Sequence, residues 1–183
     1  KIFFNQALDA IHKPTVTCLR ISDFNTSGLV GSHEEYNSPW CNLTKSSGAS
    51  DKSGGHGGSF GIGKFAPYAC SALRTVFYST SDKNGICASQ GVSRLTSFKN
   101  KKNEITQGIG FYGNDKNSPM YKQYSLDPTY SRSVENSGTD IYIAAFTGDS
   151  RWQHQMVASI LDGFLYAIYN GTLVVDVDET IIS

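Results

Sequence analysis

The sequence predicts an α+β fold, a two-layer α/β sandwich in which helices cover one face of a mixed, mostly antiparallel sheet. Helical spacing of apolar residues marks both end regions of the chain, and short strand-like segments fill the part between them. An Asn-Gly pair at residues 84–85 separates two of these segments and favours a tight antiparallel hairpin. The length of 183 residues suits one α/β domain and is short for two, so we expect a single domain over residues 1–183.

The chain opens with a predicted helix over residues 1–11, followed by a strand over residues 15–22. Apolar residues of the helix recur at helical spacing: Phe4, Ala7, Leu8 and Ile11. Pro14 ends this pattern, and the next residues are rich in β-branched side chains, which favour a strand. The strand leads into a polar segment rich in turn-forming residues, Asp23 to Leu29.

A long irregular segment, residues 30–57, comes next and is dense in Ser, Gly, Asn and Lys. Trp40 and Leu43 are its few apolar anchors. Polar connections of this length are usually functional or mobile. We therefore expect this segment to form a flexible lid.

The second half of the chain predicts several strands and one long helix. Strands are expected over residues 75–79, 85–95, 108–112, 138–146 and 173–177. A polar loop is expected over residues 113–136, and a helix over residues 151–169. The apolar positions of this helix form one stripe: Trp152, Met156, Val157, Ile160, Leu161, Phe164, Leu165 and Ile168. Such a stripe predicts a helix that packs on a sheet.

The bulk composition argues against two classes of partner. Sixteen basic and sixteen acidic residues give a net charge of zero, which does not favour a nucleic-acid surface. No segment approaches the roughly 18–20 consecutive apolar residues of a membrane span. The four cysteines lack metal-binding spacing and suit a reducing, cytoplasmic setting, with Cys18 and Cys70 expected as small core residues.

The densest chemical signal is a glycine-rich run from Gly54 to Lys64, in which six of eleven residues are glycine. Glycine allows positive φ angles and close approach of the backbone to a ligand. The run leads into residues 65–73, an expected short buried helix. Because free N–H groups and the positive dipole end of a helix attract anions, this arrangement predicts a nucleotide-binding site.

Two other interpretations of the glycine run stay open. Residues 58–64 match the Gly-x-x-x-x-Gly-Lys part of a Walker A loop, which would make the chain a degenerate P-loop NTPase. Phe65 stands where that loop needs a Mg²⁺-binding hydroxyl, and no strand is predicted before Gly58. The run could also be a mobile linker in a non-enzymatic interaction domain.

Three segments in order add a more specific signal: residues 23–29 at a strand end, residues 58–64 before a helix, and residues 137–139 at the start of a late strand. This order resembles the Bergerat ATP-binding fold of the GHKL superfamily, which includes gyrase B, the ninety-kilodalton heat-shock chaperone, MutL and sensor histidine kinases. The resemblance covers about residues 15–146.

The resemblance implies an adenine pocket at the first and last of these segments. Asp23 would accept a hydrogen bond from the exocyclic amine of adenine, and Thr139 would help it to hold a water against the base. Gly28 would let the backbone pass beside the base. Asn25 stands where the family has its first glycine, and one residue is inserted after it. Asp23 as an ordinary turn or helix-cap residue is the structural alternative.

The resemblance also implies that the second glycine segment binds the phosphates of ATP. The matching residues are Gly58, Ser59, Phe60, Gly61, Ile62, Gly63 and Lys64. Lys64 would contact a phosphate directly, or would simply be solvated at the start of the helix. Lys52, within the expected lid, would reach the terminal phosphate.

The first motif of the family, a helix with Glu-x-x-x-Asn, supplies the catalytic base and a Mg²⁺ ligand. Asn5 with the following Leu8-Asp-Ala resembles part of it, but Lys1 occupies the Glu position. We therefore expect this motif upstream of Lys1, no catalytic residue in this chain, and slow or absent hydrolysis. The resemblance implies an ATP-binding module with Mg²⁺, a nucleotide-dependent switch within a larger ATPase, and an ATP-dependent homodimer of the full-length protein.

Overall fold

The computed structural model describes residues 2–46, 63–133 and 135–183, which form two compact units, Lys1–Phe146 and Thr147–Ser183. The first unit contains α1 (Ile2–Ile11), β1 (Cys18–Ser22), α2 (Pro39–Thr44), the 3₁₀ turn η1 (Gly63–Phe65), α3 (Ala66–Ala69), β2 (Thr75–Ser81), β3 (Cys87–Arg94), β4 (Ile109–Tyr112), the 3₁₀ turn η2 (Asp115–Asn117) and β5 (Gly138–Ala144). The second unit contains α4 (Trp152–Tyr169), β6 (Val175–Val177) and β7 (Thr180–Ile182).

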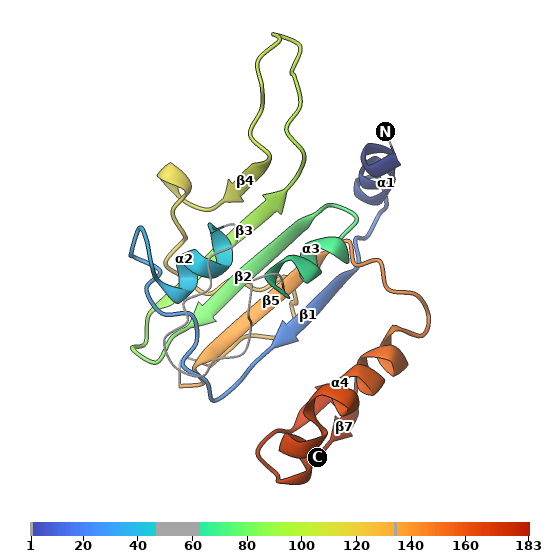
Figure 1. The fold of residues 1–183 in the computed structure, drawn as a ribbon. Helices are drawn as coiled ribbons and strands as arrows, with labels where there is room; N and C mark the ends of the chain where they lie inside the picture. Colours follow the sequence, from blue (N-terminus) through green and yellow to red (C-terminus); the bar gives the residue numbers. More distant parts are fainter. Residues whose placement is uncertain (1, 47–62, 134) are drawn as a thin grey trace. The chain divides into compact units, whose positions relative to one another are not determined.

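The first unit is built on a five-stranded sheet with the strand order β1-β5-β2-β3-β4. Every neighbouring pair in it is antiparallel. The last strand of the unit, β5, lies between β1 and β2, so it joins the first strand to the middle of the sheet (Figure 1). The predicted α+β fold class is confirmed.

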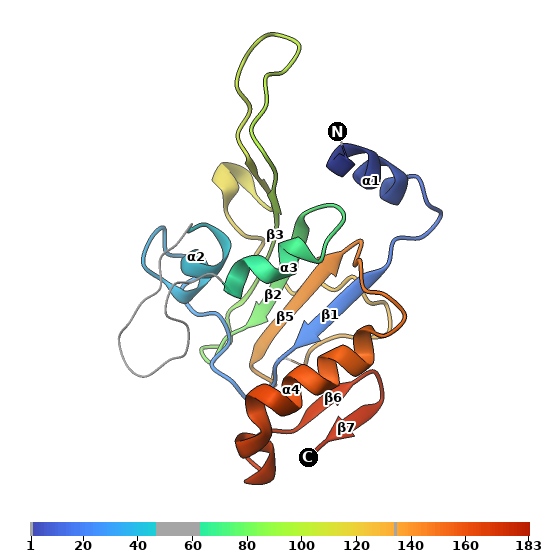
Figure 2. The same cartoon turned by 45° about the vertical axis from the view of Figure 1, so that its right-hand side comes forward.

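One face of the sheet carries the hydrophobic core. Antiparallel partners point to the same side, so Val76 of β2 shares a face with Val92 of β3 and Ile143 of β5. The short helices α2 and α3 lie on this side in both views (Figures 1 and 2). The buried core residues are Trp40, Cys41, Tyr68, Val76, Tyr78, Ala88 and Val92.

The opposite face of the sheet is polar, and the segment of residues 113–136 packs against it. Ser79 accepts a hydrogen bond from the backbone N–H of Tyr124 (3.0 Å), and the Tyr142 hydroxyl donates to Ser125 (3.0 Å). Ser89 and Met120 exchange two backbone hydrogen bonds of 2.8 and 2.9 Å. The expected polar loop is thus fixed on the sheet by hydrogen bonds and by the stacking of Tyr124 on Phe77 of β2, with ring centres 5.6 Å apart.

The hairpin between β2 and β3 forms where the Asn-Gly pair predicts it. Asp82 accepts backbone hydrogen bonds from Asn84 (2.8 Å) and Ile86 (2.9 Å) through its carboxylate. Gly85 has a φ of 77°, a left-handed conformation that glycine adopts without steric cost. The next connection, residues 95–108, forms a narrow arm that projects beyond the sheet in both views (Figures 1 and 2).

The helix α2 was not expected, because it lies inside the segment predicted to be a lid. Ser38 caps it by accepting a hydrogen bond from the Cys41 N–H (3.1 Å), and Pro39 suits its first turn. Trp40 is fully buried. Residues 47–57 of the predicted lid lie outside the described residues, so the lid itself stays a prediction.

The helix expected over residues 65–73 is shorter in the structure. After α3 the buried hydroxyl of Ser71 donates to the carbonyl oxygen of Ala144 (2.5 Å) and accepts from the N–H groups of Leu73 and Thr75. These bonds turn the chain into β2 instead of extending the helix. Cys18 and Cys70, expected in the core, are both exposed.

The second unit consists of α4 and a β6–β7 hairpin. The helix begins one residue after its predicted start and ends where expected, at Tyr169. Asp178 and Glu179 connect the two strands with φ angles of 50° and 73°, as a type I′ turn requires. β7 was not predicted. The hairpin contacts α4 through β6.

The buried tyrosine pair of the core makes the stability of the fold sensitive to high pH. Burial raises the pKa of Tyr78, and the neighbouring Tyr68, which accepts its hydrogen bond (3.1 Å), raises it further. The pKa of an ordinary tyrosine is about 10, so the unfolded chain releases the Tyr78 proton above about pH 10. The folded state retains this proton at the same pH. The free energy of unfolding should be unaffected below about pH 9 and fall above about pH 10.

We expect Tyr78→Phe to reduce the slope with which the free energy of unfolding falls above about pH 10, by up to about 1.4 kcal/mol per pH unit. Urea unfolding at several pH values between about 8 and 11 measures it. Tyr121→Phe, at an exposed position, is the control and should keep the parental pH dependence. An unchanged slope in Tyr78→Phe would show that this phenol does not couple folding to pH.

Candidate functional site

The structure brings together two predicted site residues that lie far apart in the sequence, Asp23 and Thr139. Asp23 follows β1 directly and Thr139 lies at the start of β5, its neighbour in the sheet. The backbone N–H of Asp23 donates to the Thr139 carbonyl oxygen (3.0 Å). The backbone N–H of Thr139 donates in return to the Asp23 carboxylate. Antiparallel pairing of β1 with β5 thus fixes the carboxylate at the end of the sheet.

The Asp23 carboxylate is held by neutral donors and remains accessible. Its second oxygen accepts a hydrogen bond from the Thr26 hydroxyl (2.6 Å). The Thr26 carbonyl oxygen accepts from the hydroxyl of Ser137 (2.5 Å), which ties the loop after β1 to the start of β5. A carboxylate has about four acceptor positions, and Asp23 is exposed, so it retains positions for a further donor.

The loop after β1 takes up left-handed backbone at the two positions that resemble the family glycines. Asn25 has a φ of 57° and Gly28 a φ of 61°. Asn is one of the few residues with a side chain that tolerates this region, so it can replace glycine at the first position. At the second position a Cβ atom would lie 2.7 Å from the Ser81 carbonyl oxygen, so only glycine fits.

Thr80 in β2 holds this loop in place by hydrogen bonds and was not predicted as a site residue from the sequence. Its buried hydroxyl accepts from the Leu29 N–H (2.9 Å) and donates to the Gly138 carbonyl oxygen (3.0 Å). It therefore connects the Asp23 loop to the residue before Thr139. A threonine in a strand is common on β-propensity alone, so no sequence signal distinguished it.

A buried ion pair between Arg132 and Asp140 supports the same corner from the polar face. Both side chains are almost fully buried and their charged atoms are 2.7 Å apart. Arg132 also donates to the Thr139 carbonyl oxygen (3.2 Å), and its guanidinium lies 4.6 Å from the centre of the Phe24 ring. Burial alone would lower the pKa of Arg132, but the hydrogen bonds and charge of Asp140 outweigh it and raise that pKa.

The predicted phosphate residue Lys64 lies in a different setting, beside α2. Its ammonium group donates to the Asn42 carbonyl oxygen (2.8 Å) in the last turn of that helix. Burial, followed by the charge of Arg94, lowers the pKa of Lys64. Its preceding residue, Gly63, has no positive φ, and a Cβ there would meet no atom of the described residues. The phosphate role of both residues stays a prediction.

The remaining predicted site residues cannot be placed. Gly58, Ser59, Phe60, Gly61, Ile62 and Lys52 all lie outside the described residues. Within residues 2–46, 63–133 and 135–183, no three His, Cys, Asp or Glu side chains gather as a metal site would require. None of the helices in these ranges combines the length and the apolar character of a membrane span.

Among the cavities formed by described residues, two are well defined, and neither of these is lined by Asp23 or Thr139. One, of about 460 Å³, lies beside α3 and is lined in part by Arg74 and Arg94. The other, of about 150 Å³, lies on the polar face above Asp140. Comparisons of the chain with protein-family models, with curated proteins and with solved structures found no match.

The buried ion pair yields a stability prediction. We expect Arg132→Met to lower the free energy of unfolding by about 3–5 kcal/mol, because Asp140 would remain buried without its counter-charge. Arg20→Gln is the control, since its pair with Asp127 is about one-third exposed and should be worth about 1 kcal/mol. Urea denaturation of both variants compares them. Similar losses in the two variants would contradict a special role for the buried pair.

Proposed function

We propose that the chain is an ATP-binding module of the GHKL type, which binds the adenine base at the corner formed by Asp23 and Thr139. The observation that carries the proposal is the direct contact of these two residues, 116 positions apart, at the adjoining ends of β1 and β5. The resemblance requires both residues at one site. Antiparallel pairing of β1 and β5 supports that requirement.

The chemistry of the corner suits an amino-purine. The exocyclic amine of adenine is a donor, and the Asp23 carboxylate is an exposed acceptor that enters no ion pair among the described residues. Thr139 is largely buried, and its hydroxyl has no hydrogen bond to another described residue. A water shared by this hydroxyl and the carboxylate would complete the recognition of the base.

The phosphates of ATP are assigned to residues 58–64 in this proposal. Backbone N–H groups of a glycine-rich segment suit phosphate oxygens, and Lys64 adds a point charge. Lys64 would exchange the Asn42 carbonyl oxygen for a phosphate, so nucleotide binding would release it from the end of α2. Lys52 of the predicted lid is assigned to the terminal phosphate. The exchange gives a physical basis for a nucleotide-dependent change of conformation.

The proposal covers nucleotide binding and its conformational consequence. It assigns no catalytic base within the chain; ATP hydrolysis and ATP-dependent pairing of two copies are proposed for the full-length protein. None of the four cysteines, all within the described ranges, forms a disulfide. This state agrees with the reducing cytoplasmic setting that we assign to the protein.

The adenine contact predicts the effect of removing one charge. We expect Asp23→Asn to weaken binding of both ATP and adenosine about tenfold to a hundredfold, since it removes a charged acceptor and turns an amide N–H₂ toward existing donors. Calorimetry for ATP and an NMR titration for adenosine measure it. Asp115→Asn, an exposed carboxylate in η2, is the matched control. Unchanged affinities in Asp23→Asn would refute the proposed base site.

The phosphate assignment predicts a different pattern for Lys64→Ala. We expect weaker ATP binding, because a phosphate contact is lost, and unchanged adenosine binding, because adenosine carries no phosphate. A degenerate P-loop NTPase would instead lose ATP binding entirely in Lys64→Ala and remain unaffected by Asp23→Asn. An interaction domain with a mobile glycine linker would bind neither nucleotide nor nucleoside.

A further inference from the structure

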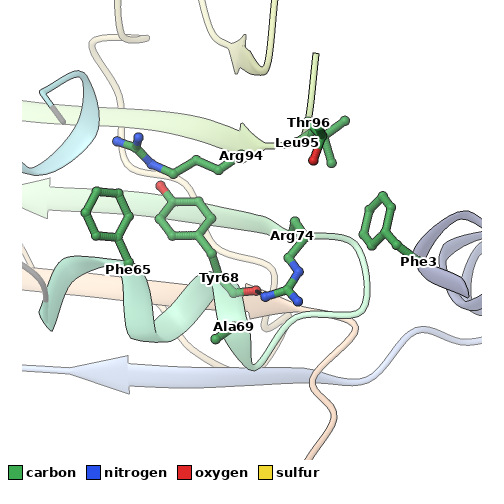
Figure 3. Close-up of a pocket in the computed structure, with 8 residues that line it drawn as sticks. All are labelled: Phe3, Phe65, Tyr68, Ala69, Arg74, Arg94, Leu95 and Thr96. Atoms are coloured by element: carbon green, nitrogen blue, oxygen red, sulfur yellow. Dashed lines mark hydrogen bonds between the residues drawn. The ribbon is translucent and has the colours of Figure 1, made fainter. Parts of the chain in front are cut away.

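The larger cavity lies at the end of the sheet where β2 begins and β3 ends, beside α3 (Figure 3). Its volume of about 460 Å³ falls in the range of small-molecule sites. The lining residues come from α1, η1, α3, β3 and the connections before β2 and after β3: Phe3, Phe65, Tyr68, Ala69, Arg74, Arg94, Leu95 and Thr96.

The cavity carries positive charge without a matching acid. Two of its lining residues, Arg74 and Arg94, are arginines, and none is acidic. The backbone N–H of Arg94 donates to the backbone carbonyl oxygen of Arg74 (2.9 Å), so the two residues are neighbours where β2 begins and β3 ends. The ion pairs formed by described residues use Arg20, Arg132 and Arg151 instead. The positive charge of Arg74 and Arg94 is therefore not balanced by an acidic lining residue.

The guanidinium groups also keep unused hydrogen-bonding capacity. A guanidinium has five N–H donors. Arg74 donates to the Tyr68 carbonyl oxygen (3.1 Å), while Arg94 reaches the carbonyl oxygens of Thr44 and Ser46 only at 3.4 Å. The Nε atom of Arg94 is buried and has no hydrogen-bond partner among the described residues. Because leaving a buried donor unpaired is costly, an anionic acceptor would be favoured beside it.

Aromatic rings form the remaining wall and give the cavity an apolar side. The Arg94 guanidinium carbon lies 4.9 Å from the centre of the Phe65 ring and 5.3 Å from that of Tyr68. Figure 3 shows Arg94 extended above these two rings, with Phe3 on the other side of the cavity. Such stacking holds a guanidinium in place while its edge remains able to bind oxygen atoms.

We infer that this cavity binds a small organic anion, in which a carboxylate or phosphate group is attached to an aromatic or apolar body. Both arginines would attract the anion by their charge, one guanidinium group would bind its oxygens, and Phe3, Phe65 and Leu95 would cover the apolar body; Figure 3 shows the two guanidinium groups on either side of Tyr68. The site is separate from the proposed adenine corner, because it shares no residue with Asp23 or Thr139; Lys64 of the proposed phosphate segment lies over the same Phe65 ring as Arg94.

Binding of three simple probes to the full chain tests the inference. Phenyl phosphate and benzoate carry the two candidate anionic groups, and benzamide is the neutral counterpart of benzoate. We expect calorimetry to detect at least one of the anions at millimolar concentration or below, and benzamide to bind at least about tenfold more weakly than that anion. The stronger of the two anions identifies the preferred group. Equal affinity for benzamide and the anions, or no binding of either anion, would overturn the inference.

Variants locate the binding within the molecule. Arg94→Gln and Arg74→Gln should each weaken the preferred probe about tenfold, whereas Lys101→Gln, on the exposed arm between β3 and β4, should not. Arg74 is exposed, so its variant keeps the test decisive if Arg94→Gln impairs folding. Asp23→Asn should leave probe binding unchanged even if it abolishes ATP binding. Loss of probe binding in Asp23→Asn, or full binding in Arg74→Gln, would contradict a separate arginine site.

Discussion

The buried ion pair between Arg132 and Asp140 is the interaction on which the first unit depends most. It joins the long segment of residues 113–136 to β5, on a face of the sheet where hydrogen bonds and the stacking of Tyr124 on Phe77 also hold that segment. A buried charge pair of this kind contributes little net stability while it is intact. Loss of one partner is strongly destabilising, because the other charge remains buried and unpaired. The ion pair therefore holds Arg132 of this segment at one position on β5.

The same pair also supports the candidate site. Arg132 bonds the Thr139 carbonyl oxygen and lies over Phe24, the residue after Asp23, so it reaches the corner where β1 and β5 end. Thr80 holds that corner from β2. The carboxylate of Asp23 is thus positioned from three strands while it remains exposed. A rigid frame around an accessible acceptor is the arrangement that selective recognition of a donor requires.

Local signals in the sequence were sufficient for several elements and insufficient for others. The Asn84-Gly85 hairpin and the helix ending at Tyr169 were predicted because their residues determine the conformation within a few positions. The helix α2 was missed because six residues are too few for a periodic pattern, although Ser38 and Pro39 form a recognisable start. The helix beginning at Ala66 was predicted too long because Ser71 is captured by a carbonyl oxygen of β5, a contact across 73 residues.

For the candidate site, the sequence by itself determined the residue types: a carboxylate after the first strand, Asn25 and Gly28 in the loop that follows it, and a glycine run before a lysine. Only the tertiary structure decided that Asp23 contacts Thr139, that Lys64 bonds α2, and that Arg74 and Arg94 share a cavity. Turn chemistry acts between neighbours in the chain, so it is visible in the sequence. Strand order and the meeting of distant charges depend on how the whole sheet assembles, and no local pattern encodes them.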